Sequence, residues 1–292
     1  MASGGQHEPG TGALGDCGTF LLDVMGTFPR DALEVRWSAK AFAPPPEVAE
    51  IIEQTWQRER ERAERDRGML FDGPLCRLIA WRTAGRLPRR RLILSLAPVG
   101  YREFIGTNAT HAHLRYTHGV EALANALGVS AAVATSDGFL VLGRRSRLVA
   151  QYAGRIHPVG GSVEPRHKGP PDPFAALTAE VHEELGLAAG EQDALCLGIV
   201  RDKHTAQPEM IFDLAVAQDL AEVQRASEKA KDAAEHEELV PVRDHPAVLV
   251  SFLERSFAEL TPIALAALLL HGQRRWGSGW FAAARGFLRS VV

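Results

Sequence analysis

Three glutamates lie close together in one short stretch of the chain. Glu180, Glu183 and Glu184 stand three and four residues apart, and side chains at these spacings share one face of an α-helix. Carboxylates that converge in this way repel one another unless a cation lies between them. Their hard oxygen atoms suit Mg²⁺, with Mn²⁺ as the alternative, and such ions also bind substrate phosphates. The stretch therefore predicts a divalent-metal site, against the alternative of an ordinary solvated acidic face.

The residues around the glutamates predict the helix that would carry them. Asp172 suits the N-cap and Pro173 the first helical position, while Gly186 suits the C-terminal end. Apolar residues recur at helical spacing between these limits, so one face of the helix should be buried. A glycine pair, Gly160 and Gly161, predicts a turn just upstream. A capped, half-buried helix with an acidic cluster beside a glycine turn favours a functional site over a solvated face.

The glycine turn and the acidic helix together resemble the Nudix box. That motif reads Gly, five residues, Glu, seven residues, Arg-Glu-apolar-x-Glu-Glu-x-Gly-apolar, and it forms a loop–helix–loop that holds divalent metal. The resemblance implies that Glu180, Glu183 and Glu184 bind the metal together with the backbone carbonyl of Gly160. It also implies that Glu183 and Glu184 are catalytic residues. Nudix proteins are mostly hydrolases of a nucleoside diphosphate linked to another group.

The box in this chain departs from the motif at two positions. Ala179 stands where the motif has arginine, and Pro171 stands where it has the earlier glutamate. The segment between Gly161 and the helix is longer than the motif allows, and its Pro and Gly content predicts an irregular loop. The arginine normally orients one of the glutamates. The sequence therefore supports metal binding more directly than catalysis.

Sequence blocks outside and around the box resemble one Nudix branch, which cleaves UDP-glucose and UDP-galactose and whose box also lacks the arginine. The blocks are residues 71–78, 101–108, 127–147 and 157–165, and the resemblance spans about residues 70–242. It implies Mg²⁺-dependent hydrolysis of the diphosphate linkage of a UDP-sugar to UMP and sugar 1-phosphate. Two alternatives stay open: a Nudix hydrolase of another nucleoside diphosphate derivative such as ADP-ribose, and a non-catalytic nucleotide-binding module.

These blocks also supply candidates for substrate binding. Arginine forks match phosphate oxygens, and aromatic or short polar side chains can stack on a base or bond to it. Surface arginines, core aromatics and turn-forming polar residues are the alternatives. The candidates are Phe71, Asp72, Tyr101, Asn108, Arg144 and Arg145. The base that takes a proton from the attacking water stays open between Glu183, Glu209, Glu235 and Glu237.

The order of apolar segments predicts the fold class. Strands that alternate with helices indicate an α/β protein, here a Nudix-type α/β/α sandwich preceded by a smaller α+β N-terminal subdomain. We expect residues 1–17 to be disordered, residues 18–117 to form the subdomain and residues 118–292 to form the Nudix domain. A helix is expected over residues 118–127, and a short amphipathic tail after Gly279.

Composition restricts the partners of the chain. Its 292 residues are 46% hydrophobic, enough for one large domain or two smaller ones. A net charge of −3 argues against nucleic-acid binding by bulk electrostatics. Three scattered cysteines and the absence of a signal or membrane-spanning pattern predict a cytoplasmic protein that does not bind membranes. The expected partner is a small nucleotide-sugar substrate; the oligomeric state does not follow from the sequence.

Overall fold

The computed structural model describes residues 15–65, 70–86, 88–147, 151–190 and 193–288. Within them, the largest element is a nine-stranded sheet of order β1-β2-β10-β11-β6-β7-β12, with β8 paired to β7 and β9 paired to β6. Its strands are β1 (Gly15–Asp16), β2 (Phe20–Phe28), β6 (Gly128–Ala134), β7 (Phe139–Arg145), β8 (Ile156–His157), β9 (Val159–Ser162), β10 (Ala194–Asp202), β11 (Pro208–Ala215) and β12 (His236–Arg243). Strands β11 and β6 are parallel.

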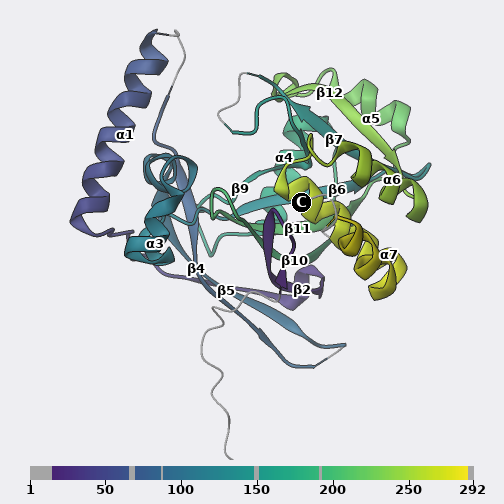
Figure 1. Cartoon of the computed structure of the whole chain (residues 1–292), viewed down its shortest axis with the longest axis horizontal. Coiled ribbons are helices and arrows are strands. Elements are labelled where there is room, and N and C mark those ends of the chain that lie inside the picture. The colour runs from purple at the N-terminus through teal and green to yellow at the C-terminus, as the bar shows by residue number, and fades with distance from the viewer. Residues whose placement is uncertain (1–14, 66–69, 87, 148–150, 191–192, 289–292) are drawn as a thin grey trace, which may run out of the picture.

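Helices cover both faces of this sheet. One face carries α4 (Pro173–Leu185) and α5 (Leu220–Ser227), and the other carries α6 (Pro246–Ser256) and α7 (Pro262–Leu288). Successive side chains of a strand point to opposite faces. In β11, Phe212 accordingly packs against Phe174 of α4, whereas Ile211 packs on the α7 side. Figure 1 shows α7, in yellow, in front of β10 and β11. The predicted α/β/α sandwich is confirmed.

A smaller sheet and several short helices precede the sandwich. The sheet has the order β3-β5-β4, and its Leu92, Leu94 and Leu96 are buried in the same core as α4. Helix α1 lies at the left of Figure 1, away from the nine-stranded sheet. The elements are β3 (Leu33–Trp37), α1 (Pro46–Arg65), β4 (Pro74–Ala84), β5 (Arg91–Gly100), α2 (Tyr101–Phe104) and α3 (Arg115–His118), with a π-helical turn at Ile105–Ala109 and 3₁₀ turns at Arg30–Ala32, Ala112–Leu114, Val120–Ala122 and Ala233–Glu235.

The helix expected over residues 118–127 is wrong. A single 3₁₀ turn, Val120–Ala122, is followed by an extended Leu123 and by Asn125 at φ 50°. Apolar residues of this segment are buried one after another rather than along one stripe, which an extended chain permits and a half-buried helix does not. Ala126 instead forms a bridge to Arg77 of β4.

The ends of the sandwich also differ from expectation. Residues 1–14 of the segment expected to be disordered lie outside the described residues, but Gly15–Asp16 pair with β2 and Cys17 is buried. Strand β2, expected in the N-terminal subdomain, is bonded to β10 of the large sheet. The expected boundary between the two domains, at residues 117 and 118, stays a prediction. At the other end, α7 continues past Gly279 to Leu288, with a kink at Gly277 (φ 83°).

Two further properties concern the whole described chain. No helix in the described ranges is both long enough and apolar enough to cross a membrane. Cys17, Cys76 and Cys196 are buried, and no disulfide joins them in the described part of the chain. Burial raises the pKa of both the Cys76 and Cys196 thiols to about 12, so these two thiols stay protonated at neutral pH.

A buried ionic network fixes α7 to the sheet. The His271 side chain is 1% exposed, and its two ring nitrogens lie 2.9 Å from Asp213 Oδ1 and 2.9 Å from Asp244 Oδ1. Arg274 also bonds Asp213, and Arg275 lies 3.3 Å from Asp244. Burial alone would lower the pKa of His271, but the hydrogen bonds to the two carboxylates outweigh it and raise this pKa to about 9. The network anchors the helix whose first turn borders the cavity described below.

We expect His271→Gln to lower the free energy of unfolding by about 2 to 3 kcal/mol at pH 6 and by less at pH 9.5. A histidine with a raised folded pKa binds more protons in the folded state. Its stabilisation is complete below about pH 6.5 and is lost as the pH rises through about 9. Urea unfolding of both proteins at the two pH values measures this difference, and an equal loss at both would contradict the network.

Candidate active site

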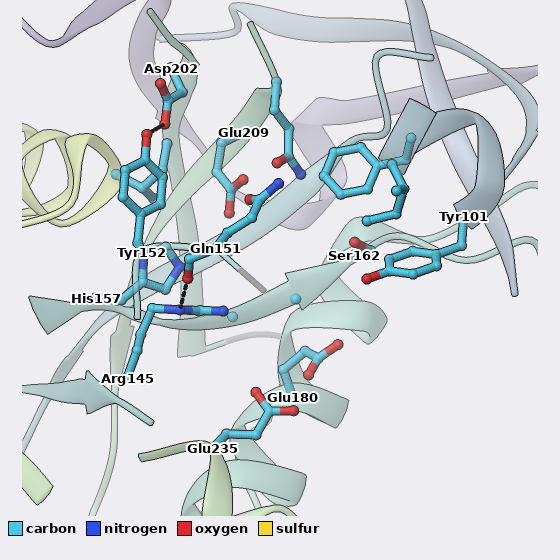
Figure 2. Close-up of a pocket in the computed structure, with 16 residues that line it drawn as sticks. Tyr101, Arg145, Gln151, Tyr152, His157, Ser162, Glu180, Asp202, Glu209 and Glu235 are labelled. Atoms are coloured by element: carbon cyan, nitrogen blue, oxygen red, sulfur yellow. Dashed lines mark hydrogen bonds between the residues drawn. The ribbon is translucent and has the colours of Figure 1, made fainter. Parts of the chain in front are cut away.

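A cavity of about 420 Å³ lies at the edge of the large sheet where β6 and β11 begin. These two strands are parallel, so their first residues meet at one edge, and β9 with its glycine pair adjoins β6 there. Figure 2 shows Tyr101 on one side of the cavity, Tyr152 and Asp202 on the other, and Glu180 and Glu235 below. The sequence therefore brings the acidic helix, the glycine turn and several distant loops to one place.

Helix α4 begins and ends as its sequence predicts. The Asp172 side chain accepts hydrogen bonds from the backbone N–H groups of Phe174 (3.1 Å) and Ala175 (3.3 Å). Gly186 closes the helix in the left-handed region at φ 66°. The apolar side of the helix is buried in the core, and this orientation fixes the direction in which its glutamates point.

Glu184 ties the helix to the glycine turn. It is 3% exposed, its Oε1 accepts a hydrogen bond from the backbone N–H of Gly160 (3.0 Å), and its Oε2 lies 2.5 Å from Nε2 of His236 on β12. Ala179, at the position of the motif's arginine, is exposed. In this chain His236, which lies on β12, orients Glu184. No motif in the sequence indicates this histidine.

Glu180 lines the cavity beside the glycine pair. A Cβ atom added to Gly161 would lie 2.0 Å from Glu180 Oε1, so a larger residue there would displace the Glu180 carboxylate. Burial and the neighbouring carboxylates Glu184, Glu183 and Glu235 raise the pKa of Glu180 to about 8. Oxygen donors held together at this electrostatic cost fit a divalent cation, which would favour the charged form.

Glu183 points elsewhere. Its carboxylate lies 2.8 Å from Lys231 Nζ, is 36% exposed and does not line the cavity. The hydrogen bond from Lys231 lowers the pKa of Glu183. The structure thus gathers Glu180, Glu184 and Gly160, and it turns Glu183 toward solvent. Across the described ranges, no three His, Cys, Asp or Glu side chains are arranged as ligands of one metal ion, so metal binding stays a prediction.

Two of the candidate bases line the cavity. Glu209 is 6% exposed and accepts a hydrogen bond from Ser130 Oγ at 2.6 Å. Burial raises the pKa of Glu209 to about 8. Glu235 also lines the cavity, and burial together with Glu184 raises its pKa. Glu237 lies outside the cavity and accepts a hydrogen bond from the backbone N–H of Arg147 (3.2 Å).

Of the six substrate-binding candidates, Tyr101 and Arg145 line the cavity. Tyr101 begins α2, and burial raises the pKa of its phenol. Arg145 ends β7, and its Nε donates to the backbone carbonyl of Gln151 at 3.0 Å. The neighbouring Arg144 points away, because adjacent side chains of a strand face opposite sides. It pairs with Glu238 (2.7 Å) and Glu259 (2.9 Å).

The other three candidates do not line the cavity. Asn108 is fully buried, and its amide accepts from the backbone of Asn125 (2.7 Å) and donates to that of Thr205 (3.0 Å). Asp72 accepts a hydrogen bond from the backbone N–H of Arg102 (2.9 Å) in α2. Phe71 is 76% exposed and does not line the cavity. The turn-forming alternative therefore describes Asp72, and Asn108 holds two buried loops together.

Several lining residues are not among the site candidates that the sequence indicates. Gln151, Tyr152, His157, Asp202 and Gln207 come from turns and strand ends that only the fold brings together. Burial, Arg145 and His236 hold the pKa of His157 well below its usual range, so this ring is neutral at pH 7. One local feature accompanies the set. Tyr152 has φ 52°, an uncommon conformation for a bulky residue.

The chain is similar in sequence to several known proteins that are named as Nudix hydrolases or as uridine diphosphate glucose pyrophosphatases. It is 30% identical over 211 residues, 64% of this chain and 67% of the relative, to the mouse uridine diphosphate glucose pyrophosphatase NUDT22. It is 32% identical over 217 residues, 64% of this chain and 70% of the relative, to the human protein of the same name. It is also 25% identical over 228 residues, 66% of this chain and 71% of the relative, to Nudix hydrolase 9 of Arabidopsis thaliana. No protein-family model matches the chain.

Proposed function

Since the chain belongs to the Nudix hydrolases, and is an enzyme acting on diphosphate bonds, we propose that it hydrolyses a UDP-sugar to UMP and sugar 1-phosphate. UDP-glucose and UDP-galactose are the proposed substrates. The names of the mouse and human relatives support this substrate class. The observation that carries it is one cavity in which Glu180 and Gly160 lie with Arg145 and Tyr101. Acidic, cationic and aromatic groups are what a metal-bound nucleoside diphosphate requires.

Glu180, Glu184 and the backbone carbonyl of Gly160 are the groups that would hold Mg²⁺. When bound, the ion would neutralise charge on the diphosphate and lower the pKa of an attacking water. Glu184 would keep Gly160 in position through the N–H bond that it already accepts. Glu209 and Glu235 line the cavity, and one of them would act as the base that takes a proton from the attacking water.

Arg145 and Tyr101 would hold the substrate. A guanidinium matches the oxygens of a phosphate in charge and geometry. Because His157 is neutral at pH 7, Arg145 would supply the positive charge that faces the phosphate. The Tyr101 ring, with Phe104 and Ile105 beside it on the same cavity, offers an apolar surface on which a uracil can stack. The substrate would then extend from Tyr101 across the glutamates.

Arg145→Ala is expected to lower kcat/KM for UDP-glucose about 10- to 100-fold, because a charged hydrogen bond to phosphate is lost. Arg144→Ala is the matched control, since Arg144 pairs with Glu238 and Glu259 outside the cavity. Initial rates of UMP release from both variants test the difference. Equal losses in the two variants would remove Arg145 from the site.

A substrate panel tests the proposed function itself. UDP-glucose, UDP-galactose and ADP-ribose are incubated with protein and Mg²⁺, and nucleoside monophosphate is measured by chromatography. We expect UMP from the UDP-sugars at a kcat/KM well above that for ADP-ribose. Faster cleavage of ADP-ribose would favour the other Nudix substrate class. Binding of UDP without turnover of any compound would contradict the enzymatic proposal and favour a nucleotide-binding module.

A further inference from the structure

One wall of the cavity carries hydrogen-bonding groups that the proposed metal site and base do not use. Gln151, Tyr152 and Asp202 form this wall, and Figure 2 shows Tyr152 and Asp202 on the side away from Tyr101. Tyr152 follows Gln151 in a turn after β7, and Asp202 ends β10. Two segments about fifty residues apart thus build one polar surface.

Gln151 has an unused donor. Its Nε2 atom is buried and bonds no partner among the described residues. In Figure 2 its side chain points into the cavity, toward Glu209. A buried donor without an acceptor costs free energy in the folded protein. A ligand oxygen that enters this part of the cavity would satisfy it.

Tyr152 and Asp202 form a hydrogen-bonded pair with spare capacity. The Tyr152 hydroxyl donates to Asp202 Oδ2 at 2.5 Å, and Asp202 is 2% exposed. Asp202 Oδ1 accepts from the backbone N–H groups of His204 (2.6 Å) and Thr205 (3.2 Å). A carboxylate offers about four acceptor sites and a phenol oxygen also accepts. The pair can therefore take further hydrogen bonds from a ligand.

The backbone on both sides of this wall is held in uncommon conformations. Tyr152 has φ 52°, and Ala206, in the turn that joins Asp202 to Gln207, has φ 58°. Residues other than glycine rarely adopt a positive φ, and such strained conformations are common at ligand-binding sites. The turn is fixed by a bond from the Ala206 N–H to the Asp202 carbonyl (2.8 Å). This bond and the two backbone conformations shape the wall at both of its segments.

The chemistry of the wall suits a polyol. Sugar hydroxyls donate and accept at once, and the wall offers an amide donor, a carboxylate acceptor and a phenol. The opposite side, with Tyr101 and Phe104, is aromatic and suits a flat base, while Arg145 and Glu180 border the space between them. A uridine at Tyr101 would place the sugar, at the far end of the diphosphate, against Tyr152.

We infer that Gln151, Tyr152 and Asp202 bind hydroxyl groups of the sugar and determine which UDP-sugar the enzyme accepts. This inference rests on the proposed function. The three residues are specificity determinants, since they contact the sugar rather than the reacting phosphorus.

The test compares UDP-glucose with the methyl ester of UDP, which keeps the uridine and the diphosphate linkage but carries a methyl group in place of the glucosyl group. We expect Gln151→Leu and Tyr152→Phe each to lower kcat/KM for UDP-glucose about threefold to tenfold and to leave that for the methyl ester unchanged. Gln151→Leu should fold as stably as wild type, because the lost nitrogen bonds no described residue. Tyr116→Phe, at a tyrosine that is 76% exposed, is the control.

The outcomes separate the subsite from the proposed function. Equal losses for UDP-glucose and the methyl ester would overturn the inference, because the wall would then hold the base or the diphosphate. Unchanged kcat/KM for UDP-glucose in both variants would overturn it as well. Wild-type protein that cleaves neither compound would refute the proposed function and this subsite with it. A loss confined to UDP-glucose, with Tyr116→Phe like wild type, would support the inference.

Discussion

Glu184→Leu is expected to abolish turnover and to lower the free energy of unfolding by about 3 kcal/mol. The buried carboxylate accepts from the backbone N–H of Gly160 and lies 2.5 Å from His236. Leucine fills a similar volume but leaves both partners unsatisfied in the interior. The glycine turn would lose its position next to Glu180, so the proposed metal site would be disrupted along with the fold around it.

Urea unfolding and UMP release from UDP-glucose measure these two effects. Glu238→Leu is the control, because Glu238 lies on β12 like His236 but is 59% exposed and, within the described ranges, forms an ion pair with Arg144. Such a pair contributes at most about 1 kcal/mol. An unfolding midpoint of Glu184→Leu equal to that of the control would show that Glu184 does not hold the glycine turn.

Glu180→Gln is expected to abolish turnover while it stabilises the metal-free protein. Burial and the neighbouring carboxylates raise the pKa of Glu180 to about 8, so its folded form keeps a proton that the unfolded form loses near its ordinary pKa. Between these two values the unfolded state binds fewer protons, and stability falls as the pH rises. Glutamine carries no charge and removes this penalty, which is on the order of 3 kcal/mol above pH 8.

The stabilisation should therefore depend on pH. In the presence of a chelator, we expect Glu180→Gln and wild type to have the same urea midpoint of unfolding at pH 4.5. At pH 8.5 we expect the midpoint of the variant to lie at a higher urea concentration than that of wild type. Added Mg²⁺ should raise the wild-type midpoint and leave that of the variant unchanged. A variant less stable than wild type at pH 8.5 would mean that the Glu180 carboxylate is stabilised by its surroundings.

The sequence predicts the framework of this site because its signals are local. Asp172 and Gly186 mark the ends of α4, and the spacing of Glu180 and Glu184 with the glycine pair predicts where these groups meet. Spacing alone does not predict direction. The spacing places Glu183 on the same helix face as Glu180 and Glu184. Its carboxylate nevertheless bonds Lys231, which lies 48 residues later in the chain, and points out of the cavity.

The remaining residues depend on tertiary structure. Arg144 and Arg145 are equivalent in sequence, and only the orientation of β7 in the sheet decides which one reaches the cavity. Asn108 has the polarity of a ligand-binding residue, but burial commits its amide to backbone partners. Tyr152 and Asp202 meet across 50 residues, a contact that no periodic pattern encodes. The Nudix box predicts the glutamates of the cavity, but pairs of residues that are distant in sequence, such as Tyr152 and Asp202, become visible only in the structure.

The most direct measurement of the central claim is UMP release from UDP-glucose after chelation and stepwise return of Mg²⁺. Wild-type protein is expected to be inactive with chelator and to recover its full rate with Mg²⁺, whereas Glu180→Gln should stay inactive at every Mg²⁺ concentration. Full turnover by chelated wild-type protein, or recovery of the variant to the wild-type rate, would contradict a metal-dependent centre at Glu180, Glu184 and Gly160.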